Sequence, residues 1–290
     1  MRDPQIRRGG AVEITAYVLV ASLLCVAAAA PALLGVIPGD IAGLVVPVAQ
    51  LTPFLTALIF WAVMRPGTFT TAFAMRWSWA GVGIGVSAVA VISAAQLIAG
   101  LTVGEWQVRP LEMIVPAGIA VVPFLVLQSA FAIGEELGWR GWLATRTARY
   151  PFAAAATVSA VAWAFWHLPA VPLIVVDGDW QRAAAYLLAI MSWAPFLLAL
   201  RQLTGSVWAA VVAHGALNSI RVFFTQSVAS SSSVSWPVEA IGWVAWLGAA
   251  VLLVHLARRQ RPPLAGRHSR PLTAQDMQQS RILPRECTNA

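Results

Sequence analysis

The sequence predicts an all-α, polytopic membrane protein with about eight transmembrane helices and both termini in the cytoplasm. Of its 290 residues, 59% are hydrophobic and 11% are charged, whereas a soluble domain usually carries about 25% charged residues. A helix that crosses a bilayer needs about 20 mostly apolar residues. Eight runs reach an adequate length, at roughly 11–35, 41–64, 78–101, 113–134, 152–176, 183–203, 206–225 and 236–257.

The orientation follows from the 19 basic residues, all of which are arginines. With a cytoplasmic N-terminus, the inside segments contain Arg65, Arg76 and Arg146, among others, and the outside loops keep Arg109 and Arg182. This distribution is the positive-inside pattern. A nucleic-acid-binding protein would gather its basic residues on one surface, so we expect no nucleic-acid partner. We expect a multi-pass protein of the cell membrane, and the absence of lysine suggests a GC-rich bacterial genome.

The expected domain organisation is a cytoplasmic segment over 1–10, a membrane domain over 11–257 and a disordered cytoplasmic tail over 258–290. The first apolar run is long for a signal peptide and seven more spans follow, so we expect it to remain uncleaved. The serine-rich stretch 226–235 reads as a flexible outer connection. Cys25 and Cys287 support neither a disulfide framework nor a cysteine-ligated metal site.

The densest group of charges within the apolar part of the chain is the stretch GEELGWRGW, which contains Glu135, Glu136 and Arg140. A charged side chain in a transmembrane segment costs roughly 2.5–3.5 kcal/mol, so such groups indicate function. Glu136 and Arg140 are spaced i,i+4 and can pair, whereas Glu135 points about 100° away, toward the face of Gln128. Because 113–146 would be roughly 50 Å long as one helix, we expect a tilt, a kink or an exit from the membrane.

Two further helices carry polar residues at a comparable depth. From the turn near Arg149, Glu135 and His167 lie roughly 21 and 27 Å along adjacent antiparallel helices. His214 and Asn218 are spaced i,i+4, and they lie roughly 15 and 21 Å from an inner turn. We therefore expect one carboxylate, two imidazoles and one amide to converge inside the membrane.

These groups suit the hydrolysis of a peptide bond. A desolvated carboxylate can deprotonate a water molecule that an imidazole holds, and a His–Asn pair supplies donors for an oxyanion. The sequence contains no G-x-S-x-G elbow, no suitably placed cysteine and no H-E-x-x-H helix, so serine, cysteine and zincin mechanisms are poorly supported. Arg221 shares the face of His214 and Asn218. We expect it to reach the outer interface rather than to bind substrate.

Three motifs, in order and on separate helices, resemble those of the CPBP family, the CAAX-protease and bacteriocin-processing (Abi-type) membrane proteins. The family's E-E-x-x-x-R is similar to residues 135–140, its F-x-x-x-H to residues 163–167, and its H-x-x-x-N to residues 214–218. The resemblance covers about residues 120–225, which would be the protease core. Trp163 stands where the family commonly has phenylalanine, so we expect an altered pocket wall with the chemistry retained.

The resemblance implies an intramembrane endopeptidase in which Glu135 and His167 activate water. It also implies that His214 and Asn218 form the oxyanion site, with Glu136 and Arg140 in support. The implied partners are the lipid bilayer and a membrane-anchored peptide or protein substrate. We expect no cofactor. The alternative is a zinc-dependent protease that uses Glu135, His167 and His214 as ligands.

Two other function classes stay open at this point. In a catalytically silent scaffold or immunity protein, the motifs would only maintain the fold. A small transporter could use intramembrane ionisable groups as a proton relay, although we see no inverted repeat. The substrate is not readable from the sequence, and the prenylated substrate of the family's eukaryotic members should not be carried over to a bacterial protein.

Overall fold

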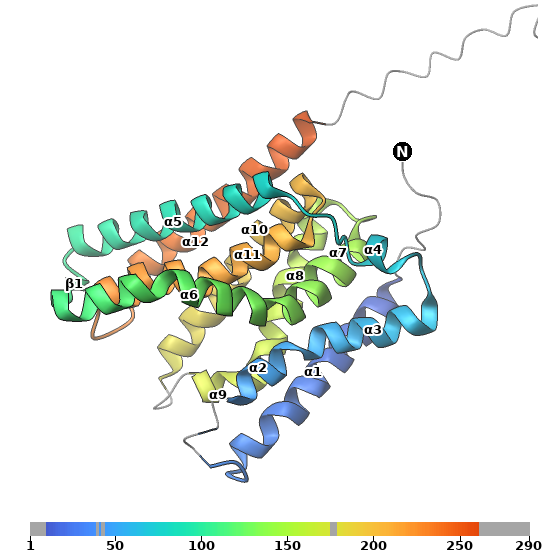
Figure 1. Ribbon diagram of the computed structural model, residues 1–290, viewed down its shortest axis with the longest axis horizontal. Helices are drawn as coiled ribbons and strands as arrows, with labels where there is room; N and C mark the ends of the chain where they lie inside the picture. The colour runs from blue at the N-terminus through green and yellow to red at the C-terminus, as the bar shows by residue number, and fades with distance from the viewer. Residues whose placement is uncertain (1–9, 39–40, 42–43, 175–178, 261–290) are drawn as a thin grey trace, which may run out of the picture.

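The computed structural model describes residues 10–260, apart from 39–40, 42–43 and 175–178. The predicted N-terminal segment, apart from Gly10, and nearly all of the predicted tail, including Cys287, lie outside the described residues. Within them the protein is helical apart from turns and a two-residue strand pair, which confirms the all-α membrane fold (Figure 1). The cytoplasmic location of both termini and the domain boundaries remain predictions.

Seven helical segments in the described ranges are long and apolar enough to cross a membrane. Three of these segments contain more than one helical element. The segments are α1 (Ala11–Leu33), α2 with α3 (Val45–Gln50 and Thr52–Met64), α5 (Trp79–Thr102), α6 with its continuation (Leu111–Thr147), α10 (Trp180–Thr204), α11 with its continuation (Val207–Val228) and α12 (Trp236–Arg259).

The remaining predicted span, 152–176, is not among these seven segments, because its helix is shorter than the apolar run suggested. Its helix α8 covers only Phe152–His167, and a 3-10 turn and the short helix α9 (Val171–Ile174) follow. Pro169 and Pro172 explain this end, because proline lacks an N–H donor and disfavours helical geometry in the residue before it. At 16 residues, α8 is about 24 Å long, which is less than the roughly 30 Å of a bilayer's hydrocarbon core.

The long segment that carries the acidic motif is one continuous helical rod that changes its winding. α6 (Leu111–Glu136) passes into a π-helix at Leu137–Leu143 and then into α7 (Ala144–Thr147). The irregularity that the length of this segment predicted therefore lies within the motif, at Leu137–Leu143, three residues after Gly134. Two further π-helices, Leu217–Arg221 and Phe223–Val228, follow α11 (Val207–Ala216). Single π-turns in helices often mark functional sites.

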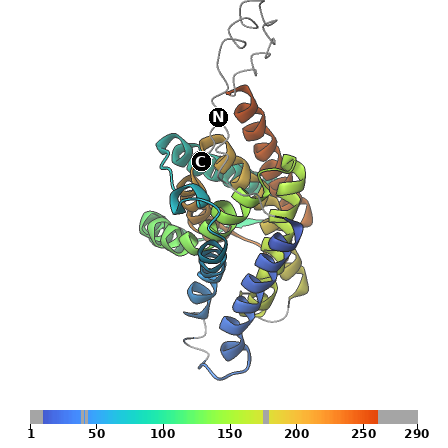
Figure 2. The same cartoon turned by 90° about the vertical axis from the view of Figure 1, so that its right-hand side faces the viewer.

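The helices pack around the acidic stretch. α10 packs against α12 and α8, and α11 packs against α6 and α5, while α1 and α3 lie side by side at the other end of the molecule (Figures 1 and 2). The core contains Trp139, Trp142, Trp163 and Trp166, each at most 2% exposed. The stretch 134–146 is therefore buried in protein, as expected for the floor of a site.

Two of the arginines that set the predicted topology are structural. Arg146 is 2% exposed, and its guanidinium binds the carboxylate of Glu13 with one N–O distance of 2.6 Å, which ties α7 to the start of α1. Arg201 donates to the backbone oxygen of Arg140 and to the hydroxyl of Thr145, at 3.2 and 2.8 Å. Both side chains hold the end of the motif-bearing segment in place.

The predicted flexible connection 226–235 contains an ordered contact. β2 (Ala229–Ser230) pairs antiparallel with β1 (Gln107–Val108). Trp106, 7% exposed, packs with Ala229 and Val238 beneath this ladder. The serine-rich composition concealed this contact, because the pairing partner lies more than 100 residues earlier in the chain.

Candidate active site

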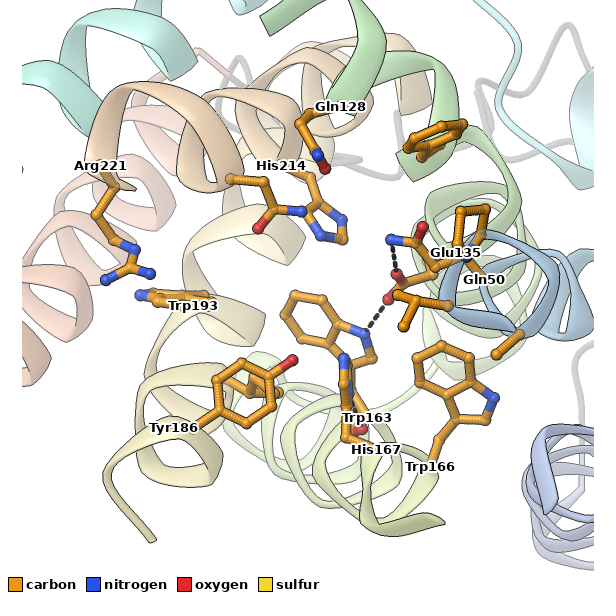
Figure 3. A pocket seen from close by; sticks show the side chains of 16 residues that line it. Gln50, Gln128, Glu135, Trp163, Trp166, His167, Tyr186, Trp193, His214 and Arg221 are labelled. Carbon is orange, nitrogen blue, oxygen red and sulfur yellow. Dashed lines mark hydrogen bonds between the residues drawn. The ribbon is translucent and has the colours of Figure 1, made fainter. Parts of the chain in front are cut away.

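A cavity of about 340 Å³ lies between the motif-bearing helices. All four predicted catalytic residues, Glu135, His167, His214 and Asn218, line it, and they come from α6, α8 and the α11 segment (Figure 3). The predicted convergence of carboxylate, imidazoles and amide is therefore present. Further lining comes from α2 and α10, through residues that include Gln50, Tyr186 and Trp193.

Two glycines allow the helices to approach closely enough to form this site. A Cβ atom on Gly134 would lie 2.5 Å from the backbone oxygen of Gln50, and one on Gly215 would lie 2.1 Å from the hydroxyl oxygen of Ser129. Only a residue without a side chain fits at either contact. Small residues of this kind let helix backbones pack tightly in membranes. They bring α2 and the α11 segment against α6, on either side of the carboxylates.

Glu135 is held by two neutral donors. The side-chain amide of Gln50 donates to one carboxylate oxygen at 2.9 Å, and the indole N–H of Trp163 donates to the other at 2.6 Å (Figure 3). The side chain is only 1% exposed, yet it lines the cavity. Neither donor carries a charge, and no arginine or histidine of the described residues forms an ion pair with this carboxylate. Each oxygen keeps lone-pair capacity for a water molecule.

The histidine on α8 has its tautomer fixed by the backbone. Nδ1 of His167 lies 2.8 Å from the carbonyl oxygen of Trp163. A carbonyl oxygen can only accept, so Nδ1 carries the proton, and Nε2 of a neutral ring has a free lone pair. His167 is therefore equipped to accept a hydrogen bond from water through Nε2.

Glu136, in contrast, is held by Arg140 and His214. Its Oε1 accepts from Nη1 of Arg140 at 2.9 Å and contacts Nδ1 of His214 at 2.9 Å, and Glu136 and Arg140 are both fully buried. The predicted i,i+4 pair is thus present and extends to a third residue on another helix. This ion cluster joins the acidic motif to the His–Asn motif.

The contact with Glu136 also defines what His214 can do. A carboxylate accepts only, so Nδ1 of His214 donates to Glu136. Nε2 then donates to an oxyanion only when the ring is a doubly protonated imidazolium. Asn218 lies beside His214 on the cavity wall and adds an amide donor.

Trp163 is the central side chain of the site. Its ring lies 4.1 Å from the guanidinium carbon of Arg140, and the ring centroids of His167 and His214 lie at 5.5 and 5.2 Å. Because its N–H also binds Glu135, Trp163 touches all the ionisable motif residues except Glu136. A phenylalanine at this position could stack in the same way but could not donate to the carboxylate.

Sequence reasoning assigned no site role to Gln50, and it placed Arg221 at the outer interface. Both residues line the cavity, Gln50 from α2 and Arg221 from the π-helix that also carries Asn218. No local signal identified Gln50, because it lies 85 residues before Glu135 and in no motif. Arg221 could have been recognised from its position three residues after Asn218, on the face already assigned to the site.

Glu135, His167 and His214, the ligands of the zinc alternative, line one cavity. Within the described ranges, no group of three or more His, Cys, Asp or Glu side chains has the arrangement of a metal site. The Nδ1 atoms of both histidines are engaged with an oxygen, and a metal-binding histidine commonly uses its other ring nitrogen in this way. The hydrogen bonds of these residues are therefore compatible with either version of the protease.

Residues 116–220 match the family model described as type II CAAX prenyl endopeptidase Rce1-like. The matched segment contains all three motifs and all four cavity-lining catalytic candidates. The match confirms the family resemblance that the motifs predicted. No curated protein matches the chain.

Proposed function

We propose that this protein is an intramembrane endopeptidase that cleaves a membrane-associated peptide or protein with a water molecule activated by Glu135 and His167. One observation carries the proposal. Three helices that are separate in the sequence place the acidic, histidine and His–Asn motifs on one buried cavity, and the family match spans the same segment. The coarser assignment, a multi-pass membrane protein of a CAAX-type endopeptidase family, agrees with the seven apolar spans.

The proposed mechanism begins with a water molecule between Glu135 and Nε2 of His167. The carboxylate of Glu135 takes one proton as the water oxygen attacks the carbonyl carbon of the scissile peptide bond. The C–N bond then breaks, and the same proton moves to the leaving nitrogen. The water supplies the hydroxyl of the new carboxyl group and the hydrogen of the new amine, so the atoms balance.

The oxyanion that forms during attack needs donors already in position. We assign this role to Nε2 of the His214 imidazolium and to the amide N–H of Asn218. Glu136 keeps His214 protonated and oriented, and Arg140 balances the charge of Glu136. Removing one preorganised donor of this kind costs about 10²–10³ in kcat.

We assign the metal-free version, because Glu135 and Nε2 of His167 suffice to hold the attacking water. The competing zinc-dependent protease would bind the metal through Glu135 and the Nε2 atoms of His167 and His214. Exhaustive chelation of the purified protein tests this point. Retained cleavage with less than stoichiometric zinc by elemental analysis is expected, whereas zinc-restored activity would overturn the metal-free version.

The protease itself is tested by comparing membrane proteomes of cells that express the wild type, Glu135→Ala or Glu112→Ala. Glu112 is a matched control, because it lies on α6 and is exposed at the start of that helix. New peptide termini should appear in membrane proteins with the wild type and with Glu112→Ala, and they should be absent with Glu135→Ala. Identical peptide termini in all three samples would favour the scaffold class instead.

A further inference from the structure

A second cavity, of about 510 Å³, adjoins the catalytic one and extends toward the loop between the α11 segment and α12. Tyr186, Trp193 and Arg221 line both cavities and form their shared wall. In Figure 3, Arg221 lies beside Trp193 at the end of the catalytic cavity opposite Glu135. A substrate that reaches Glu135 from this side passes Arg221.

Arg221 is half-buried, and its guanidinium makes few hydrogen bonds for a charged side chain. Its guanidinium carbon lies 4.8 Å from the ring centroid of Trp193. Its Nη1 has only a 3.5 Å contact with the hydroxyl of Thr225, and its buried Nε has no hydrogen-bond partner. Over the described part of the chain, no carboxylate lies within 4.0 Å of the guanidinium nitrogens. A charge removed from water without a directly bound counter-ion is costly, so this arrangement favours an anionic ligand.

The second cavity has an excess of positive charge. Arg109, Arg182 and Arg221 line it, whereas Glu239 is its single acidic lining residue. Arg182 is paired with Asp179 at 3.1 Å, so Arg109 and Arg221 carry the excess. The side-chain amide of Gln96 approaches the carboxylate of Glu239 at 3.5 Å, and Glu239 is not within ion-pair distance of Arg221. Serine hydroxyls, including that of Ser231, add neutral donors to the wall. A low-dielectric cleft of one sign of charge attracts ligands of the other sign.

The position of Arg221 relates this charge to the catalytic groups. It follows Asn218, the proposed oxyanion donor, by three residues in the same π-helix, roughly 4.5 Å along the axis at the α-helical rise, and both residues line the catalytic cavity. An extended peptide advances about 3.3 Å per residue. A group bound by Arg221 is therefore only a few residues of extended chain from the bond that Glu135 and His167 would attack.

We propose that Arg221 binds a carboxylate of the substrate within about four residues of the scissile bond, and that it thereby selects anionic substrates. This inference rests on the proposed protease function. The planar guanidinium suits bidentate recognition of a carboxylate. Either a free C-terminus or an Asp or Glu side chain provides this group.

Binding can be measured separately from cleavage with the Glu135→Gln protein in nanodiscs of zwitterionic lipid. The probes are N-palmitoylated peptides of mixed apolar sequence, in two matched series. In the first series, each peptide ends in either a free carboxylate or a carboxamide. In the second series, each peptide is amidated and carries either Asp or Asn at one internal position, and this position is varied along the peptide. We expect the acid member of one series to bind about tenfold tighter than its neutral partner, the effect of one charge-assisted hydrogen bond.

The same peptides are then offered to otherwise wild-type protein and to three arginine variants. Arg221→Gln should abolish the preference for the acid peptide in both kcat/KM and binding, and Arg221→Lys should restore part of it. Arg259→Gln removes the same charge from an exposed position at the end of α12 and should leave the preference unchanged. Equal losses for acid and neutral peptides in Arg221→Gln would overturn the inference.

Two other results distinguish a failure of the proposed protease function from a failure of the carboxylate site. Acid-selective, Arg221-dependent binding without cleavage by the wild type would contradict the protease and leave the carboxylate site standing. If anionic lipid added to the nanodiscs abolishes the acid preference through Arg221, the site binds lipid headgroups and the inference is wrong.

Discussion

Glu135 and Glu136 are adjacent in the chain, yet their surroundings differ in kind. Glu135 accepts hydrogen bonds from two neutral groups, Gln50 and Trp163, and faces a cavity. Glu136 is bound by Arg140 and His214 and is completely buried. One carboxylate is oriented without a directly bound cation, and the other is the anionic centre of an ion cluster.

This difference shows how one motif can serve reaction and architecture together. Successive residues on a helix point about 100° apart, so one glutamate faces α2 and the cavity while the next faces α11. A base must remain free to change its protonation state, and neutral donors permit that change. A buried structural charge must keep its counter-ions, because losing them is costly. Substitutions of the two glutamates and of their partners test whether the two roles can be separated.

The largest expected effect is loss of catalysis in Glu135→Gln. General-base catalysis contributes about 10²–10⁴ in rate, so kcat should fall by that factor. The melting temperature in detergent should fall less than it does in Glu136→Ala, because glutamine keeps the size and one acceptor oxygen. Glu112→Gln provides the matched control for cleavage of a peptide found in the proteomic comparison. Activity within twofold of the wild type would remove Glu135 from the mechanism.

The second effect concerns stability. Glu136→Ala leaves Arg140 buried without its carboxylate, and breaking a buried pair in this way costs about 3–5 kcal/mol. Denaturant unfolding in detergent should report this loss, and Glu112→Ala should show almost none. Simultaneous replacement by Glu136→Gln and Arg140→Met should recover part of the free energy of unfolding. A Glu136→Ala protein as stable as the wild type would contradict the structural role.

Trp163→Phe sharpens the comparison further, because it removes one donor from Glu135 and keeps an aromatic ring. A hydrogen bond to a charged group contributes about 1.5–3 kcal/mol, so kcat should fall about tenfold or more while KM stays nearly constant. Trp139→Phe is the matched control, since its buried indole N–H has no hydrogen-bond partner. Similar kinetics for the two variants would show that the Trp163 N–H is dispensable.

The smallest effect is expected for Gly134→Ala. The added methyl group would lie 2.5 Å from the backbone oxygen of Gln50, and such overpacking costs about 1–3 kcal/mol. The displacement should also weaken the bond from Gln50 to Glu135 and lower kcat modestly. Gly83→Ala adds the same group on α5 where no atom lies within 4 Å, and it should be neutral by melting temperature and cleavage. Equal behaviour of the two variants would argue against close packing at Gly134.

Local spacing predicted much of this site. The i,i+4 rule identified the Glu136–Arg140 pair, and counting residues from the turns placed Glu135, His167 and His214 at comparable depth. These inferences succeed because helix geometry relates residues within one segment, and because antiparallel neighbours share their turns. The apolar composition predicted the membrane fold for a similar reason, since span length follows from bilayer thickness.

Contacts between segments distant in the sequence were not predictable in this way. Gln50 reaches Glu135 because Gly134 lets two backbones approach, and no pattern in one segment records the other. The indole N–H of Trp163 was visible as a departure from phenylalanine, but its acceptor was not. The π-helix at Leu137–Leu143 has no composition signal, and Pro169 and Pro172 were hidden within an apolar run.

The early end of α8 has a consequence for the supply of a reactant. The last four carbonyl groups of a helix have no partner within it, and α8 ends at His167, about 24 Å from its start and so within the thickness of the hydrocarbon layer. Unpaired backbone at such depth is tolerated where it lines a protein cavity that holds water. Hydrolysis consumes water, which the hydrocarbon layer excludes. In the proposed mechanism, the early end of α8 therefore gives His167 a place where the cavity can supply that water molecule.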